Sequence, residues 1–179
     1  MLAAAVTTTG RIAHARADQT DPRLEALFTH LKAASNLFAA REIEVDIWHI
    51  WAASDDGAVS ALMQQGLSAM DQGDMRRALD KFDQIVTIAP NFAEGWNRRA
   101  TVNYLLGNYT KSLSDIEKTL MLEPRHFGAL SGRGLVYMAL GKEELALESF
   151  EAALKVYPLM PGASRNAEEL RKRLHRRDI

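Results

Sequence analysis

One spacing, 34 residues, recurs in this chain and limits what it can fold into. It separates equivalent residues in five columns. The columns are Gly73, Gly107 and Gly141; Pro90, Pro124 and Pro158; Ala78, Ser112 and Ala146; Phe82, Ile116 and Phe150; and Gly66, Ala100 and Gly134. A fixed period of this length is the signature of a repeat architecture, in which each copy is one supersecondary unit that packs on its neighbours.

The residue types in these columns predict two amphipathic helices per copy, joined by a tight turn. A glycine at the turn can adopt the left-handed conformation that ends the first helix. Small residues in two further columns allow the paired helices to approach closely, and the bulky column fills the space between them. The proline follows the second helix and stops it, because proline cannot continue the hydrogen-bond ladder. Asp74 is expected to begin one second helix, and Asn91 with Glu94 has the pattern of a capping box.

These columns resemble the tetratricopeptide repeat (TPR), a helix–turn–helix unit of 34 residues. The copies run over residues 59–92, 93–126 and 127–160. The third copy has the most family residues in place: Gly134, Tyr137, Gly141, Ala146, Phe150, Ala153 and Pro158. The resemblance implies an all-α fold, a right-handed superhelical solenoid of three TPR units over residues 57–160, with flanking helices.

The flanks are expected to be an N-terminal helical hairpin over residues 18–56 and a C-terminal capping helix over residues 161–179. Apolar stripes place the two hairpin helices at about 21–33 and 36–53. The hairpin is either a diverged repeat or a cap on the first TPR, with the aromatic run "IWHIW" at 47–51 packed beneath that repeat. A basic cluster near the C-terminus either completes a solvated helix end or contacts nucleic acid or anionic lipid.

The resemblance also implies a concave groove, lined by the first helix of each copy, that binds a segment of a partner protein. The candidate groove residues by family position are Met63, Leu67 and Met70 from the first copy, Asn97, Arg98, Thr101 and Tyr104 from the second, and Ser131, Leu135 and Met138 from the third. Methionine and leucine suit adaptable apolar contact. Asn97 and Arg98 are able to bind a peptide backbone or a carboxylate. The alternative is that these are ordinary solvated positions.

Some family members hold the terminal carboxylate of a chaperone tail in a clamp of lysines, asparagines and an arginine. The clamp positions are occupied here by Met63 and Leu67 in the first copy and by Gly128 and Gly132 in the third. Arg98 alone falls where the family has a polar clamp residue. The resemblance therefore speaks against this subclass.

Arg99 belongs to a column with Gln65 and Arg133, where the family commonly has leucine. One interpretation is that these side chains pack along their stems, while their heads reach solvent or nearby acids such as Asp83 and Asp115. The other interpretation is a basic ladder of Arg99 and Arg133 along one edge of the groove, which would receive an acidic partner.

Composition excludes several classes of function. The chain has 22 basic and 23 acidic side chains, so it has no general nucleic-acid-binding character. It has no cysteine, which excludes thiolate metal sites and cysteine nucleophiles. Its five histidines do not fall at metal-ligand spacing. The sequence therefore predicts no metal, no cofactor, no small-molecule substrate and no catalytic residue, and it has no apolar run long enough to span a membrane.

Residues 1–17 have features of a signal peptide. They are rich in small residues, lack Asp and Glu, and end in Ala15-Arg16-Ala17, an A-x-A pattern. A disordered tail is the alternative. The sequence as a whole is similar to small exported bacterial TPR proteins, which implies a non-catalytic protein–protein interaction scaffold in a periplasmic or other envelope location. The competing functions are a cytoplasmic co-chaperone or regulatory adaptor, a nucleic-acid accessory protein and an enzyme.

Overall fold

The computed structural model describes residues 18–177, which form nine α-helices and no strand. The helices are α1 (Arg23–Ala33), α2 (Leu37–Ala52), α3 (Gly57–Asp71), α4 (Met75–Ile88), α5 (Ala93–Leu105), α6 (Tyr109–Leu122), α7 (Phe127–Ala139), α8 (Glu143–Val156) and α9 (Pro161–Arg177). The signal-peptide-like segment, residues 1–17, lies outside the described residues. No helix of the described part has the length and apolar character needed to cross a membrane.

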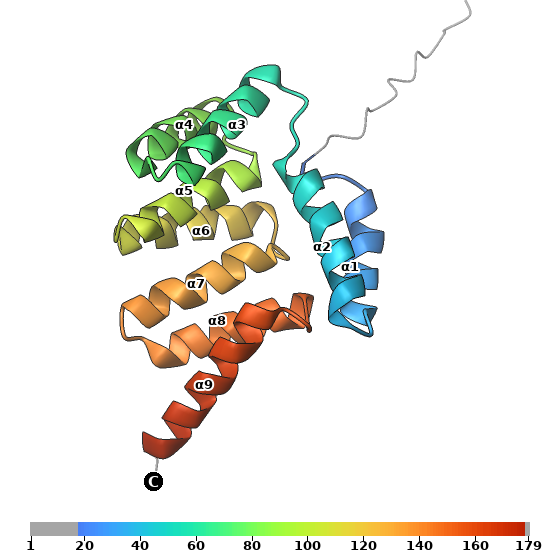
Figure 1. Cartoon of the computed structure of the whole chain (residues 1–179), viewed down its shortest axis with the longest axis vertical. Coiled ribbons are helices and arrows are strands. Elements are labelled where there is room, and N and C mark those ends of the chain that lie inside the picture. Colours follow the sequence, from blue (N-terminus) through green and yellow to red (C-terminus); the bar gives the residue numbers. More distant parts are fainter. Residues whose placement is uncertain (1–17, 178–179) are drawn as a thin grey trace, which may run out of the picture.

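Helices α3 to α8 form three helix–turn–helix repeats that stack in chain order (Figure 1). Each turn contains a glycine with positive φ: 75° at Gly73, 75° at Gly107 and 69° at Gly141. Glycine adopts this conformation without the steric penalty of a Cβ atom. Asp74 begins α4, as predicted, by accepting the Arg77 N–H at 3.0 Å. Each second helix ends two residues before the proline of its column, so the repeats predicted from the 34-residue period are confirmed.

The paired helices of a repeat approach so closely that a Cβ atom at two of the column positions would overlap a neighbouring ring. A Cβ atom at Gly66 would lie 2.6 Å from the Phe82 ring, and one at Gly134 would lie 2.7 Å from the Phe150 ring. Both rings are completely buried. The absence of a side chain on the first helix is therefore what makes room for the aromatic plug on the second.

Helix α9 covers the last repeat at the C-terminal end. Ala163, Ala167 and Leu170 are completely buried in the same core as Phe150 of α8. Much of the basic cluster on the exposed side is paired with acids. The pairs are Arg171 with Glu151, Lys172 with Glu168, Arg173 with Glu169 and Arg177 with Glu144. This pairing lowers the positive potential that contact with nucleic acid or anionic lipid would require.

The hairpin of α1 and α2 lies beside the stacked repeats (Figure 1). Its core includes Phe127 at the start of α7 and Tyr157 directly after α8. The Tyr157 hydroxyl donates to Glu44 of α2 at 3.2 Å, and Arg125 pairs with Glu25 of α1 at 2.6 Å. The expectation that the hairpin caps the first repeat is therefore wrong. The apolar face of the hairpin packs against the start of α7 and the end of α8, which are distant from it in the sequence.

The aromatic run at 47–51 is the centre of this docking. Trp51 is 1% exposed and stacks on His126, with ring centroids 4.0 Å apart and an interplanar angle of 10°. Trp48 contacts Phe127 edge-on. A Cβ atom at Gly128 would lie 2.6 Å from the indole ring of Trp48. The run thus packs on the start of α7, and the expected position beneath the first repeat is wrong.

Candidate functional site

One cleft between the first helices of the second and third repeats is lined by five of the predicted groove residues. These are Asn97, Thr101, Tyr104, Ser131 and Leu135. The cleft has a volume of about 180 Å³, and its other walls are mostly small residues, with Ile116 from α6 and Met160 beyond α8. We call it the α5–α7 cleft.

The α5–α7 cleft is uncharged. Its polar groups are hydroxyls and the Asn97 amide, and no charged side chain is among the residues that line it. The Thr101 hydroxyl is already used, because it donates to the Asn97 backbone oxygen at 2.9 Å. Gly132 leaves open space, since a Cβ atom there would meet only Ile116, at 3.9 Å. The cleft is smaller than typical cofactor sites, and it suits one large apolar side chain next to a peptide backbone.

Four other predicted groove residues lie in the cores of the repeats or pack against them. Met63 is 3% exposed between α3 and α4, and Leu67 and Met70 pack on the same core while remaining partly exposed. Met138 packs on the core that α7 and α8 share with α9. None of these four residues lines the α5–α7 cleft. The structure therefore gathers five of the candidates, all from the second and third repeats, and leaves out Met138 and the three candidates of the first repeat.

Arg98 lies at the interface with the hairpin. Its Nε is 2.5 Å from Oε1 of Glu94, an ion pair one helical turn apart, although the N–H direction does not meet hydrogen-bond geometry. The guanidinium also lies 5.4 Å from the centroid of the Trp48 ring, within cation–π range. Arg98 is thus engaged within the chain, and it does not line the α5–α7 cleft.

Glu94 is a buried carboxylate at the centre of this network, with 1% of its surface exposed. Its Oε2 accepts from Asn97 Nδ2 at 2.9 Å and lies 3.0 Å from His126 Nε2. His126 Nδ1 accepts the Ala129 N–H at 3.1 Å, so the neutral ring has its proton on Nε2 and donates to Glu94. Burial by itself favours the uncharged acid, but Arg98, His126 and Asn97 outweigh burial and hold the pKa of Glu94 below its usual value.

The capping box expected from Asn91 and Glu94 does not form. The residue at the N-cap of α5 is Phe92, which makes no side-chain hydrogen bond there. Gln19 instead accepts the Ala93 N–H at 3.2 Å. The Glu94 carboxylate points into the protein instead, where Asn97, His126 and Arg98 are its partners.

Replacing Glu94 by glutamine should remove one acid-sensitive part of the stability. The folded state lowers the pKa of Glu94 below the ordinary value of 4.5, so its contribution is complete above that pH and is lost as the pH falls below it. Glutamine does not titrate. The difference in unfolding free energy between wild type and Glu94→Gln, from urea denaturation, should therefore shrink between about pH 6 and about pH 3. A difference that stays constant over this range would contradict the lowered pKa.

Arg99 bonds to two acids on neighbouring helices. It donates to Asp83 of α4 at 2.8 Å, and twice to Asp115 of α6, at 2.6 and 3.0 Å. Arg133 donates to Ser149 at 3.1 Å. These contacts agree with the interpretation in which the arginine heads reach nearby polar groups. Both guanidinium groups are therefore hydrogen-bonded to neighbouring helices. Neither arginine lines the α5–α7 cleft.

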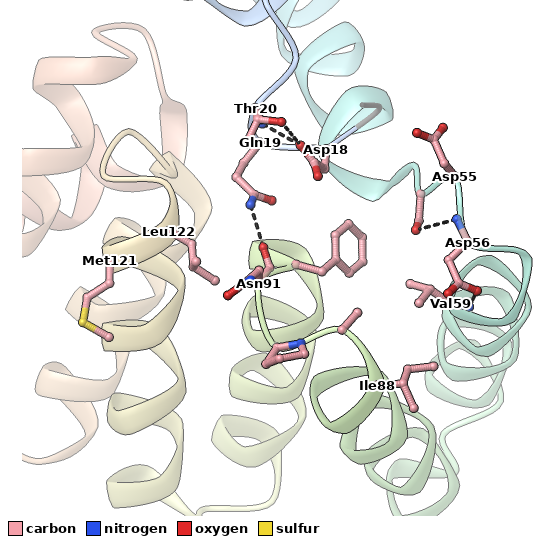
Figure 2. A pocket seen from close by; sticks show the side chains of 14 residues that line it. Asp18, Gln19, Thr20, Asp55, Asp56, Val59, Ile88, Asn91, Met121 and Leu122 are labelled. Atoms are coloured by element: carbon pink, nitrogen blue, oxygen red, sulfur yellow. Dashed lines mark hydrogen bonds between the residues drawn. The ribbon is translucent and has the colours of Figure 1, made fainter. Parts of the chain in front are cut away.

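A second and larger cleft, of about 580 Å³, lies between the N-terminal segment and the first two repeats (Figure 2). Figure 2 shows Gln19 reaching the turn before α5, where its amide donates to the backbone oxygen of Asn91 at 2.7 Å. Asp56, on the opposite wall, accepts the Ala58 N–H and caps α3. No predicted groove residue lines this cleft. It is a competing position for a ligand.

Two parts of the site were missed from the sequence. The contacts of the hairpin with Arg98 and His126 were missed because these residues belong to no repeating pattern in the sequence. The Glu94–Arg98 pair could have been found, because its spacing is that of a helical ion pair. Gly132, noted above only as a lost clamp position, is what opens the α5–α7 cleft. Among residues 18–177, no group of three or more His, Asp or Glu side chains is placed to hold a metal ion.

Comparison with known proteins identifies relatives over most of the chain. Two family models, both described as tetratricopeptide repeat, match residues 63–120 and 127–159. A TPR repeat-containing protein of Rhizobium etli is 41% identical over 147 residues, which cover 82% of this chain and 70% of that protein. Tetratricopeptide repeat protein 36 of Bos taurus is 32% identical over 119 residues, covering 64% of this chain and 63% of the relative.

Solved structures share the arrangement of the repeats. The first TPR of Spaghetti (RPAP3), bound to the HSP90 peptide SRMEEVD, has a TM-score of 0.65 at 23% identity, covering 68% of this chain and 96% of that one. The Sgt2 TPR domain from Aspergillus fumigatus also has a TM-score of 0.65, at 21% identity, covering 69% and 83% of the two chains. With the family models and the Rhizobium relative, these matches show that the chain belongs to the tetratricopeptide repeat family.

Proposed function

We propose that this protein is a non-catalytic interaction scaffold that binds an extended, uncharged segment of a partner protein in the α5–α7 cleft. The observation that carries the proposal is the convergence of Asn97, Thr101, Tyr104, Ser131 and Leu135 on one open cleft without charged walls. The first TPR of RPAP3, which shares the fold, is solved with a bound peptide, and this supports peptide binding as the use of such a surface.

The chemistry of the cleft favours an apolar side chain over a carboxylate. The peptide bound to RPAP3, SRMEEVD, is rich in acidic residues. An acidic tail would find no cationic side chain lining the α5–α7 cleft, and Arg98 nearby is already paired with Glu94. The competing function, a cytoplasmic co-chaperone that holds acidic tails, therefore has less support from this site than a scaffold for apolar segments.

Filling the cleft tests the proposal. Leucine at Gly132 has space for its Cβ atom, and its remaining atoms would occupy the volume that a ligand side chain needs. Leucine also favours helix more than glycine does, so Gly132→Leu should fold. We expect it to bind peptides at least about tenfold more weakly than wild type, as a blocked apolar pocket costs over about 1.4 kcal/mol. The probes are peptides selected by the wild-type protein from a random library with acetylated and amidated ends, titrated by fluorescence anisotropy.

Gly162→Leu is the matched control. Gly162 is also a helical glycine, no atom lies within 4 Å of an added Cβ, and it stands at the start of α9, outside the cleft. This variant should bind the selected peptides as the wild type does. If Gly132→Leu is folded by circular dichroism and still binds every selected peptide with wild-type affinity, the cleft is not the binding site.

We also propose that the scaffold works in a bacterial cell envelope. The support is the sequence Ala15-Arg16-Ala17 at the end of a segment without acidic residues. Mass spectrometry of the protein purified from its host should then find Asp18 as the first residue. A mature protein that retains residues 1–17 would contradict export by this route and favour a cytoplasmic adaptor.

A further inference from the structure

We propose that Asn97 is a fixed hydrogen-bond acceptor in the α5–α7 cleft, and that it selects a backbone N–H next to the apolar side chain that fills the cleft. This inference rests on the proposed function, because it names a polar contact of the bound segment. The sequence indicated that Asn97 binds either a peptide backbone or a carboxylate, and this inference selects the backbone.

The Asn97 amide is held in one orientation. Its Nδ2 donates to Oε2 of Glu94 at 2.9 Å. An ionised carboxylate only accepts hydrogen bonds, so turning the amide over would set Oδ1 against Oε2 and lose this bond inside the protein. The ion pair with Arg98 keeps Glu94 in its charged form. The oxygen of the amide is therefore the atom left for a ligand.

The Asn97 oxygen has no partner within the chain. The residue is 6% exposed and lines the cleft, yet among residues 18–177 no hydrogen bond to Oδ1 is formed. Oδ1 is also not sealed inside the protein, because it is not among the buried and unbonded side-chain atoms in that range, which are Trp51 Nε1, Glu94 Oε1 and Arg98 Nε. An accessible, unpaired acceptor on a largely buried side chain is a group that a ligand donor can satisfy.

The hairpin takes part in this site indirectly. His126, which donates to Oε2 of Glu94, is stacked on Trp51 of α2. Arg98, which pairs with Oε1, lies over Trp48 of the same helix. No hairpin residue lines the cleft. The two tryptophans thus position the groups that orient the acceptor.

A fixed acceptor in an uncharged cleft specifies the ligand. A peptide backbone presents one N–H at every residue except proline, and in an extended segment that donor lies beside a side chain that can point into the cleft. A carboxylate would instead place its oxygens against Oδ1, with no cation in the lining to compensate. The geometry therefore favours an internal, extended stretch of a protein with a large apolar residue over a free C-terminus.

Replacing single ligand amides by esters tests the role of Asn97. The probes are the acetylated and amidated peptides selected as above, resynthesised with an ester in place of one backbone amide at a time. An ester removes the N–H and adds no bulk. One position beside the apolar anchor should lose about tenfold in affinity for the wild-type protein, because Oδ1 is left without a donor. For Asn97→Ala, the ester and amide forms of that peptide should bind within about twofold of each other.

Each outcome bears on either the inference or the proposed function. If Gly132→Leu weakens binding but no ester does so in wild type, the peptide occupies the cleft and the role of Asn97 is overturned; this comparison needs no variant of Asn97. An ester effect of equal size in wild type and Asn97→Ala assigns the donor contact to another acceptor and also overturns it. If no selected peptide depends on Gly132, the proposed function fails and the inference fails with it. If the protein selects peptides only from a library with free C-termini, the inferred preference for an internal segment over a C-terminus is overturned.

Discussion

Trp51→Ala is expected to lower the free energy of unfolding by about 3–5 kcal/mol, the range for removing a large aromatic side chain from a core. Trp51 is 1% exposed and lies against four other rings, one of which is Trp48 at 5.3 Å between centroids. It stacks on His126 and lies 5.0 Å from the Phe127 centroid and 5.9 Å from that of Phe28. Its loss would leave a cavity between the hairpin and the start of α7, which neighbouring helices cannot close without losing their own contacts.

Phe38→Ala is the matched control for this experiment. Phe38 lies on the same helix, α2, and is 75% exposed, so its removal should change the stability by no more than about 0.5 kcal/mol. Urea denaturation followed by circular dichroism measures both variants. Hydrogen exchange should also show faster exchange of α1 and α2 amides in Trp51→Ala. Equal, small effects of the two substitutions would mean that the hairpin is not docked through Trp51.

Two glycines in α7, two residues apart in the sequence, should respond to alanine with opposite signs. At Gly134 the added Cβ atom would lie 2.7 Å from two atoms of the Phe150 ring, which is completely buried. Such overpacking costs about 1–3 kcal/mol. At Gly132 the nearest atom would be Ile116 Cδ1 at 3.9 Å, an ordinary contact. There, alanine should stabilise the helix by about 0.5–1 kcal/mol.

Thermal or urea unfolding of Gly134→Ala and Gly132→Ala measures this contrast in one protein. Because both substitutions add one methyl group to the same helix, helix propensity cancels between them, and the difference reports the packing against Phe150. The account requires Gly132→Ala to be the more stable variant. The reverse order would show that α7 and α8 are not packed as described.

The sequence predicted the repeats well because each of their features is local and occurs three times. A turn glycine, a small residue facing an aromatic plug and a terminating proline each depend on residues within one repeat unit. Gly141, Phe150 and Pro158 confirm this in the third repeat, where the turn, the plug and the end of α8 fall as expected. The candidate groove residues were assigned from their positions in the TPR family, and five of those on α5 and α7 line the α5–α7 cleft.

The position of the hairpin was not predictable in this way. Trp51 and His126 are 75 residues apart by their numbers, occur once, and belong to no repeating column. An apolar stripe shows that a helix face is buried, but it does not show which surface buries it. The orientation of the Asn97 amide was not predictable for the same reason. It depends on the hydrogen bond to Glu94, and Glu94 points inward because it pairs there with His126 and Arg98.

Chemical-shift mapping can locate the binding surface, which we expect to be the α5–α7 cleft. A selected peptide would be titrated into ¹⁵N-labelled protein, with Gly132→Leu and Gly162→Leu alongside. The largest shifts are expected at the amides of Thr101, Tyr104 and Ser131, and they should vanish in Gly132→Leu but persist in Gly162→Leu. Shifts centred on Gln19 and Asn91, in the larger cleft of Figure 2, and unaffected by Gly132→Leu, would contradict binding in the α5–α7 cleft.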